Sequence, residues 1–141
     1  MTAKIVAMRF HEVRVPARPG AINSPGFDKP LHMLPVGGKK GWSIQFDELP
    51  KLILELELDS GVVGYGEFYR DHDWSRIKSL APAFLGQPID SFSLQELPVP
   101  LCREHDGIEL ALWDAFAKSH ELPLHALLGG KLRDGVKVGA W

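Results

Sequence analysis

Between Lys51 and Leu58, apolar and polar residues alternate, and this pattern constrains the fold of the chain more than any other. Leucines occupy every second position, and most of the positions between them are charged. A period of two is typical of a β-strand with one buried and one solvent-facing side. Asp59-Ser60-Gly61 predicts a turn, because glycine tolerates the positive φ of tight turns. Val62–Glu67 is therefore expected to return as the second strand of a hairpin.

An earlier strand is predicted over Ile5–Val15, where β-branched residues are frequent and Pro16 ends the run. Pro16–Asp47 follows and is rich in glycine and proline. This segment of roughly 30 residues is far longer than an ordinary connection, and such loops are usually lids or binding loops. Three consecutive strands with a hairpin between the last two predict an antiparallel meander.

The period then changes from that of strands to that of helices. Helices are expected at Trp74–Leu85 with a disruption at Pro82, at Phe92–Leu97, at Asp106–Glu121, and from Pro123 to the glycine pair Gly129-Gly130. Asp106 is expected to cap the third of these helices, with Glu109 completing a capping box. The predicted fold class is therefore α+β, a three-stranded antiparallel meander followed by a helical bundle.

Composition excludes several classes of protein. The chain has 141 residues, 45% of them hydrophobic and 24% charged, with a formal net charge of −2, which indicates a globular domain without affinity for nucleic acid. The N-terminus lacks the features of a signal peptide, and no apolar run approaches the roughly 20 residues of a membrane span. The single cysteine cannot form an internal disulfide. We expect a cytoplasmic domain that contacts neither nucleic acid nor membrane.

The residues indicate no self-contained catalytic site. Five of the six histidines are candidates for metal binding or for solvated or capping roles, and no HExxH or CxxC pattern decides between these: His11, His32, His72, His120 and His125. Asp71-His72-Asp73 is compatible with acid–base chemistry and equally with a polar loop. The glycines at positions 61, 64 and 66 are arranged unlike a dinucleotide fingerprint and lead out of a hairpin rather than into a helix.

Three stretches resemble a known family. "LILELELDSGVVGYGE" (52–67), "APAFLGQPID" (81–90) and "GIELALWDAFAKSHELPLHALLGGKLRD" (107–134) are similar to the N-terminal domain of the mandelate racemase/muconate lactonizing enzyme branch of the enolase superfamily. The helix leading to the LLGG turn is the most specific of the three. The stretch between Gly86 and Gly107 is shorter than is usual in that branch.

The resemblance implies a two-domain enzyme in which this domain covers the active-site end of a (β/α)8 barrel. Family members use Mg²⁺ to stabilise the enediolate formed when a base removes the proton α to a carboxylate. Their metal ligands and bases lie on barrel strands. Residues 1–134 would be the capping domain, and residues 135–141 would begin a barrel that is absent from this chain. No catalytic or metal-binding residue transfers to this chain, and Val136–Trp141 is expected to be an extended, poorly paired tail.

The resemblance also implies that two loops close over the substrate, one matching Pro16–Asp47 and the other Phe68–Trp74. The candidate substrate-binding residues in them are Asn23, Ser24, His32, Lys39, Lys40, Trp42, Tyr69, Arg70 and His72. Trp113, Asp114 and Lys118 match the helix motif, and a structural role is expected for them because a buried helix needs packing and satisfied polar groups.

Three functions follow as hypotheses. The first is the substrate-capping domain of a Mg²⁺-dependent dehydratase or racemase/epimerase, whose partners are a small carboxylate substrate, the C-terminal barrel and further copies of the complete enzyme. The second is a free-standing, non-catalytic α+β binding module. The third is a small metalloenzyme.

Overall fold

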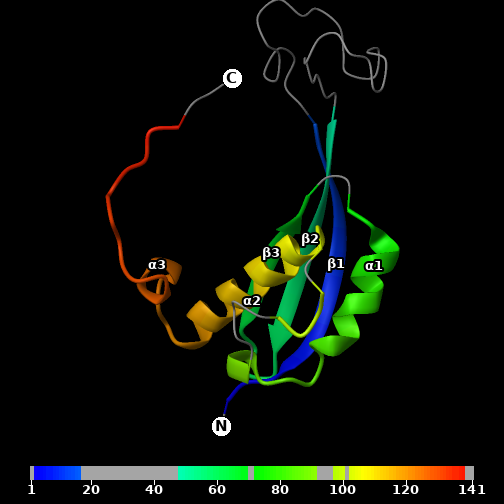
Figure 1. The fold of residues 1–141 in the computed structure, drawn as a ribbon, viewed down its shortest axis with the longest axis horizontal. Coiled ribbons are helices and arrows are strands. Elements are labelled where there is room, and N and C mark those ends of the chain that lie inside the picture. Colours follow the sequence, from blue (N-terminus) through cyan, green and yellow to red (C-terminus); the bar gives the residue numbers. More distant parts are fainter. Residues whose placement is uncertain (1, 17–47, 70–71, 92–96, 101, 139–141) are drawn as a thin grey trace, which may run out of the picture. The chain divides into compact units, whose positions relative to one another are not determined.

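A computed structural model describes residues 2–16, 48–69, 72–91, 97–100 and 102–138 of the chain (Figure 1). Its three strands are β1 (Ile5–Pro16), β2 (Glu48–Leu58) and β3 (Val63–Phe68), and they form one sheet in the order β1-β2-β3. β2 and β3 are antiparallel, with Leu52 opposite Phe68 and Glu57 opposite Val63. The predicted meander is confirmed, and β1 and β3 are its edges.

The helices follow the strands in the sequence, as predicted. They are α1 (Trp74–Leu80), α2 (His105–Ser119) and α3 (Leu124–Leu127), with short 3₁₀ turns at η2 (Ala81–Ala83) and η3 (Ile89–Ser91). α1 ends earlier than the predicted Leu85, because Pro82 falls in the segment that tightens into η2. Of the helix expected at Phe92–Leu97, all but the last residue lies outside the described residues.

The prediction that Asp106 caps α2 is wrong. α2 begins one residue earlier, at His105, so Asp106 lies inside its first turn and Glu104 occupies the N-cap position. Within the described residues, the Glu104 side chain makes no capping bond to α2. Its carboxylate accepts a hydrogen bond from the backbone N–H of Asp73 instead. The side chain at the N-cap position therefore makes a tertiary contact rather than a local capping bond.

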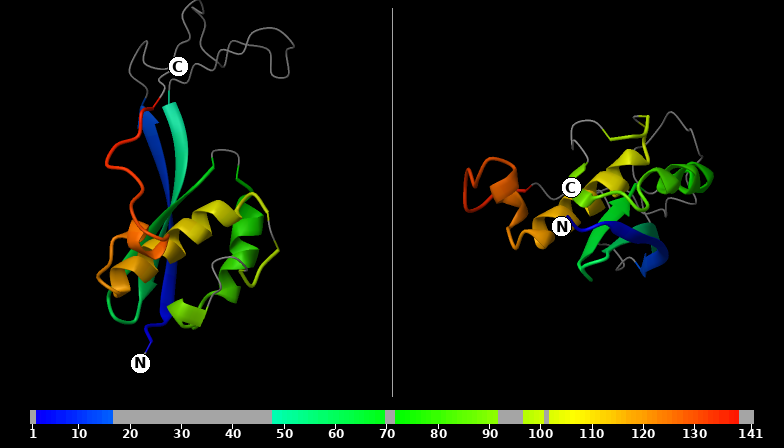
Figure 2. Two further views of the ribbon diagram at one scale, coloured as in Figure 1. Left: turned by 60° about the vertical axis from the view of Figure 1, so that its left-hand side comes forward. Right: turned by 90° about the horizontal axis from the view of Figure 1, so that it is seen from below.

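The core lies between the sheet and the helices. The leucines at positions 52, 54, 56 and 58 are at most 1% exposed, which confirms the buried face predicted for β2. They pack with buried apolar residues of the other elements, among them Ile5, Phe68, Ile77, Phe84, Ile108 and Leu112. Figure 2 shows α1 and α2 covering the same face of the sheet.

Two glycines of β3 let α2 approach the sheet closely. A Cβ atom added at Gly66 would lie 1.9 Å from the carbonyl oxygen of Gly107, and one added at Gly64 would lie 2.3 Å from the carbonyl oxygen of Ala111. Both obstacles are backbone atoms of the helix. The glycine pattern that is unlike a nucleotide fingerprint is thus explained, at these two positions, by packing.

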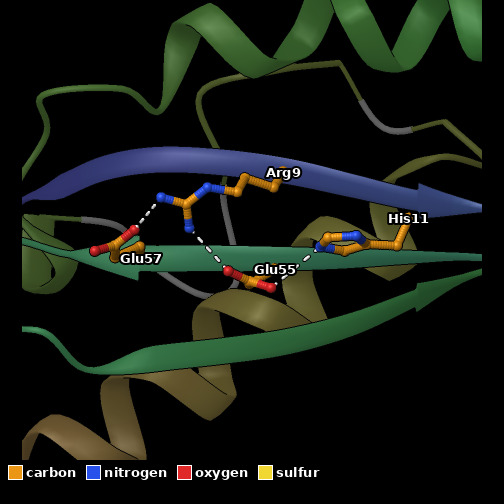
Figure 3. A network of polar contacts seen from close by, with 4 residues as sticks. All are labelled: Arg9, His11, Glu55 and Glu57. Atoms are coloured by element: carbon orange, nitrogen blue, oxygen red, sulfur yellow. Dashed lines mark hydrogen bonds and ion pairs between the residues drawn. The ribbon is translucent and has the colours of Figure 1, made fainter.

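The opposite face of the sheet carries a network of charged side chains (Figure 3). Arg9 of β1 pairs with Glu57 and with Glu55 of β2, and its Nη1 lies 2.8 Å from Glu55 Oε1. His11 Nε2 lies 3.1 Å from the other oxygen of Glu55. The hydrogen bond from Arg9 is the largest of the effects that lower the pKa of Glu55. These groups are substantially exposed, so the network contributes little to stability.

The segment after α3 contains the predicted glycine stop. Gly129 and Gly130 have φ of +92° and +103°, the left-handed conformation that ends a helix. Residues 135–138 form no strand, and residues 139–141, the second half of the tail expected at Val136–Trp141, lie outside the described part of the chain. None of the helices in the described residues is long and apolar enough to cross a membrane.

Candidate functional site

Two of the nine predicted substrate-binding residues lie in the described structure. Tyr69 and His72 lie, with Asp73, in the connection between β3 and α1, and we call these three described residues the β3–α1 loop. The other seven lie outside the described residues: Asn23, Ser24, His32, Lys39, Lys40, Trp42 and Arg70. Both described residues belong to the second of the two predicted capping loops.

The β3–α1 loop starts from a firmly packed residue. Phe68 is 1% exposed, and its ring lies so close to α2 that a Cβ atom on Gly107 would be 2.6 Å from it. Tyr69, the next residue, is 48% exposed. The guanidinium of Arg103 lies 4.6 Å from the centre of the Tyr69 ring, which is a cation–π geometry. The loop thus leaves the core abruptly and presents an aromatic ring with a cation beside it.

His72 folds back onto the start of the loop. Its backbone N–H donates to the carbonyl oxygen of Tyr69 at 3.1 Å, and its ring Nδ1 lies 3.2 Å from the same oxygen. A carbonyl oxygen only accepts, so Nδ1 carries the proton in this contact. Among the described residues no hydrogen bond engages Nε2, which is therefore the ring atom that could meet a ligand.

Asp73 ends the loop by capping α1. Its Oδ1 accepts from the backbone N–H groups of Ser75 at 2.9 Å and Arg76 at 3.2 Å. These hydrogen bonds hold the pKa of Asp73 below its usual value, and the bond from Arg76 has the largest effect. A carboxylate committed to a helix N-terminus is a poor general base, so capping is the better explanation for this member of Asp71-His72-Asp73. Asp71 lies outside the described residues.

Glu104 holds the end of the loop from the side of α2. Its carboxylate is 3% exposed, and its Oε1 accepts the backbone N–H of Asp73 at 2.9 Å. Its Oε2 lies 3.8 Å from Nη1 of Arg76. The hydrogen bond from Asp73 is the main cause that lowers the pKa of Glu104, against the opposing effect of burial. Sequence reasoning missed this residue, because a glutamate just before a helix ordinarily indicates only a solvated helix start.

Asp114 and Lys118 have the structural role predicted for them. Asp114 Oδ2 accepts the backbone N–H of Tyr65 at 2.8 Å, and Lys118 Nζ donates to the carbonyl oxygen of Val63 at 2.9 Å. Lys118 Nζ also lies 2.7 Å from Asp114 Oδ2. β3 is an edge strand, so these side chains satisfy backbone groups that would otherwise stay unpaired.

The described residues do not supply a metal site. Among them, no group of three or more His, Cys, Asp or Glu side chains could hold a metal ion. His11 pairs with Glu55, and Nδ1 of His120 lies 2.9 Å from the carbonyl oxygen of Phe116. The donor set therefore does not fit a bound Mg²⁺, and we derive no chemical step through one.

Comparison with known proteins defines the class to which this fold and loop belong. The family model for the mandelate racemase/muconate lactonizing enzyme N-terminal domain matches residues 45–129. The chain belongs to this family.

Two curated relatives and one solved structure illustrate the likeness. A probable glucarate dehydratase of Streptomyces coelicolor is 32% identical over 120 residues, which cover 65% of this chain and 28% of the relative. The N-succinyl-L-Arg/Lys racemase of Bacillus cereus is 24% identical over 152 aligned positions, which cover 96% of this chain and 36% of the relative. The muconate lactonizing enzyme of Pseudomonas fluorescens, solved with muconolactone, is 21% identical with a TM-score of 0.67; the match covers 95% of this chain and 36% of that one.

The chain thus spans about a third of the length of these relatives. That structural neighbour shares the fold, and the curated relatives include a dehydratase and a racemase.

Proposed function

We propose that this chain is the substrate-capping domain of a complete enzyme that removes the proton α to a carboxylate and then dehydrates, racemises or epimerises the acid. The observation that carries the proposal is the family match over residues 45–129. Beside it stands a short loop, anchored at both ends, that displays an exposed Tyr69 and a half-buried His72. The barrel that follows this domain in the relatives would supply the bases and the metal ligands.

The substrate class proposed is a small hydroxylated acid, such as a sugar acid, or an amino-acid derivative. The phenol of Tyr69 and Nε2 of His72 are hydrogen-bonding groups suited to hydroxyl and carboxylate oxygens. The relatives named as a glucarate dehydratase and an N-succinyl-amino-acid racemase support both substrate types. We also propose dependence on Mg²⁺, since a Roseovarius nubinhibens protein of the same fold was solved complexed with magnesium.

A free-standing binding module is the alternative. Exposed leucines argue against a free-standing module. Three of them lie between residues 122 and 132, namely Leu122 at 44%, Leu128 at 61% and Leu132 at 93% exposed. Leucines exposed to this extent in one segment are typical of a surface that another domain covers. We expect the isolated 141-residue chain to self-associate, whereas a free-standing module would stay monodisperse.

Solvent exchange tests the proposed reaction. The complete protein is incubated in D₂O with Mg²⁺ and a panel of sugar acids and N-acyl amino acids, and NMR locates the deuterium taken up. A racemase or epimerase should return the acid with deuterium at the α-carbon, whereas a dehydratase should lose the α-proton and the β-hydroxyl and take up deuterium at the carbon that carried the hydroxyl. If no acid in the panel shows either result, the proposal fails.

Variants of the loop test the capping role. Replacing His72 with glutamine is expected to raise KM for the accepted acid about tenfold, the effect of one lost hydrogen bond to a charged group. His120→Gln is the matched control, since His120 lies at the far end of α2 from the loop. Equal effects of the two variants would contradict a capping role for His72.

A further inference from the structure

The segment just before α2 holds the β3–α1 loop through consecutive residues. Arg103 lies over the ring of Tyr69 at the start of the loop, and Glu104 accepts the backbone N–H of Asp73 at its end. The two differ in burial, because Arg103 is exposed whereas Glu104 is 3% exposed. Glu104 is therefore the inner of the two contacts.

A buried carboxylate is an unusual choice for this position. Removing a charge from water is costly unless the charge is paired and hydrogen-bonded. Here one oxygen has a hydrogen bond, while Oε2 has no hydrogen-bond partner among the described residues and faces Arg76 only at 3.8 Å. The carboxylate provides a fixed, directional acceptor for one loop N–H.

The contacts around Glu104 close into a ring. Glu104 accepts from the Asp73 backbone, the Asp73 carboxylate accepts from the N–H groups of Ser75 and Arg76, and the Arg76 guanidinium returns to Glu104. The ring joins the start of α2, the end of the loop and the start of α1. The other end of the loop is also fixed on α2, through Phe68 and Gly107. Both ends of the loop are thus set by the first turn of one helix.

We propose that Glu104 is a positioning residue, which fixes the β3–α1 loop and so sets where Tyr69 and His72 meet the ligand. The inference rests on the proposed function, because it deepens the role of the same loop. Glu104 would thereby influence specificity from behind the loop, without being placed in contact with the substrate. A change at position 104 acts through the backbone of Asp73.

Amide hydrogen exchange in the 141-residue chain tests whether the hydrogen bond from Asp73 to Glu104, which we call the clamp, holds the loop. Glu104→Ala removes the acceptor, and we expect the Asp73 amide to exchange at least about tenfold faster, as for one lost hydrogen bond to a charged group. Glu104→Gln keeps an amide oxygen as acceptor, so Asp73 should change by less than about threefold. The Ala115 amide, inside α2, reports global unfolding, so the local effect on Asp73 is its acceleration beyond that of Ala115.

Asp106→Asn is the matched control, because it removes a negative charge from the same helix turn without touching the loop. Faster exchange of Asp73 in this control, or equal acceleration of Asp73 and Ala115 in Glu104→Ala, would overturn the clamp. If Glu104→Ala does not fold, Arg76→Gln with Glu104→Gln carries the test, because together they remove the charges and leave the acceptor. If the Asp73 amide of this double variant exchanges within threefold of the wild-type rate, the clamp is supported. If its protection is lost, the clamp is wrong.

Kinetics of the complete enzyme test the positioning role. We expect Glu104→Ala to raise KM about tenfold with kcat within about twofold, and Glu104→Gln to restore most of the loss. An unchanged KM beside faster Asp73 exchange would show that the loop is clamped without meeting the ligand, and would overturn the positioning role. If the wild-type enzyme removes the α-proton of no acid, the proposed function fails while the Asp73 result still decides the clamp.

Discussion

Replacing Gly66 with alanine probes the close approach of α2 to β3. The new Cβ atom would lie 1.9 Å from the carbonyl oxygen of Gly107 and 2.9 Å from the backbone nitrogen of Ala111. Both atoms belong to the helix backbone, so no side-chain rotation relieves the collision. To restore an ordinary contact of 3.4 Å to Gly107, the helix must withdraw by roughly 1.5 Å.

That withdrawal loosens the packing between α2 and the buried leucines of β2. Overpacking of this kind costs about 1–3 kcal/mol, and a backbone obstacle places Gly66→Ala at the upper end of that range. A domain of this size has a free energy of unfolding of about 5–15 kcal/mol. We therefore expect the urea midpoint to fall by about 1 M or more, given a denaturant dependence of roughly 1–3 kcal/mol per molar.

Two further glycine variants separate collision from backbone strain. Gly135→Ala meets nothing within 4 Å and has no positive φ, so it should leave the urea midpoint of the 141-residue chain unchanged. Gly61→Ala also meets nothing, but its φ of +83° costs about 1–2 kcal/mol. If Gly66→Ala unfolds at the same urea concentration as the wild type, the close packing of α2 on β3 is wrong.

Other changes test the remaining contacts. The pKa values of Glu104 and Glu55 are lowered in the fold, so their contribution to stability is fully present above the unfolded-state pKa of about 4.3 and is lost as pH falls through the lower folded values. The free energy of unfolding in urea should therefore decline below about pH 4.3, and Glu104→Gln should make that decline shallower. An equal slope in both proteins would refute this. Lys118→Met leaves the Val63 carbonyl of the edge strand without its donor. It should lower the free energy of unfolding by about 0.5–1 kcal/mol in urea denaturation and increase aggregation in light scattering. Lys78→Met on α1 is the control and should do neither. Leu54→Ala in the core should cost about 2–5 kcal/mol by urea denaturation, and a cost below 1 kcal/mol would contradict the burial of β2.

The sheet and the order of elements could be predicted from local patterns. The alternation of β2 and the turn at residues 59–61 each depend on a few neighbouring residues, so the hairpin followed from the sequence. The helix motif indicated structural roles for Asp114 and Lys118, and their contacts with β3 confirm those roles.

The interactions missed by sequence reasoning are the non-local ones. Asp106 has the residue type and spacing of a cap, yet α2 begins before it, and the side chain at the N-cap position, Glu104, engages Asp73, 31 residues earlier, rather than its own helix. The close approach at Gly64 and Gly66 is equally non-local, since the obstructing atoms belong to α2. No local periodicity reports which helix will cross a strand, or at what distance.

The proposed division of labour places specificity in this domain and chemistry in the barrel. A loop that is held at both ends suits such a role, because binding loses less entropy when the contacting groups are already in place. The clamp by Glu104 would then be part of the specificity apparatus, although it lies behind the loop.

Hydrogen exchange of the complete protein, with and without its acid substrate, tests the central claim most directly. The account predicts that a peptide covering residues 68–74 exchanges more slowly when substrate is bound, because the β3–α1 loop closes over it. A peptide covering the hairpin turn at residues 59–62, at the other end of β3, should exchange at the same rate in both states. Unchanged exchange of residues 68–74 in an enzyme that is turning over its substrate would contradict the capping role.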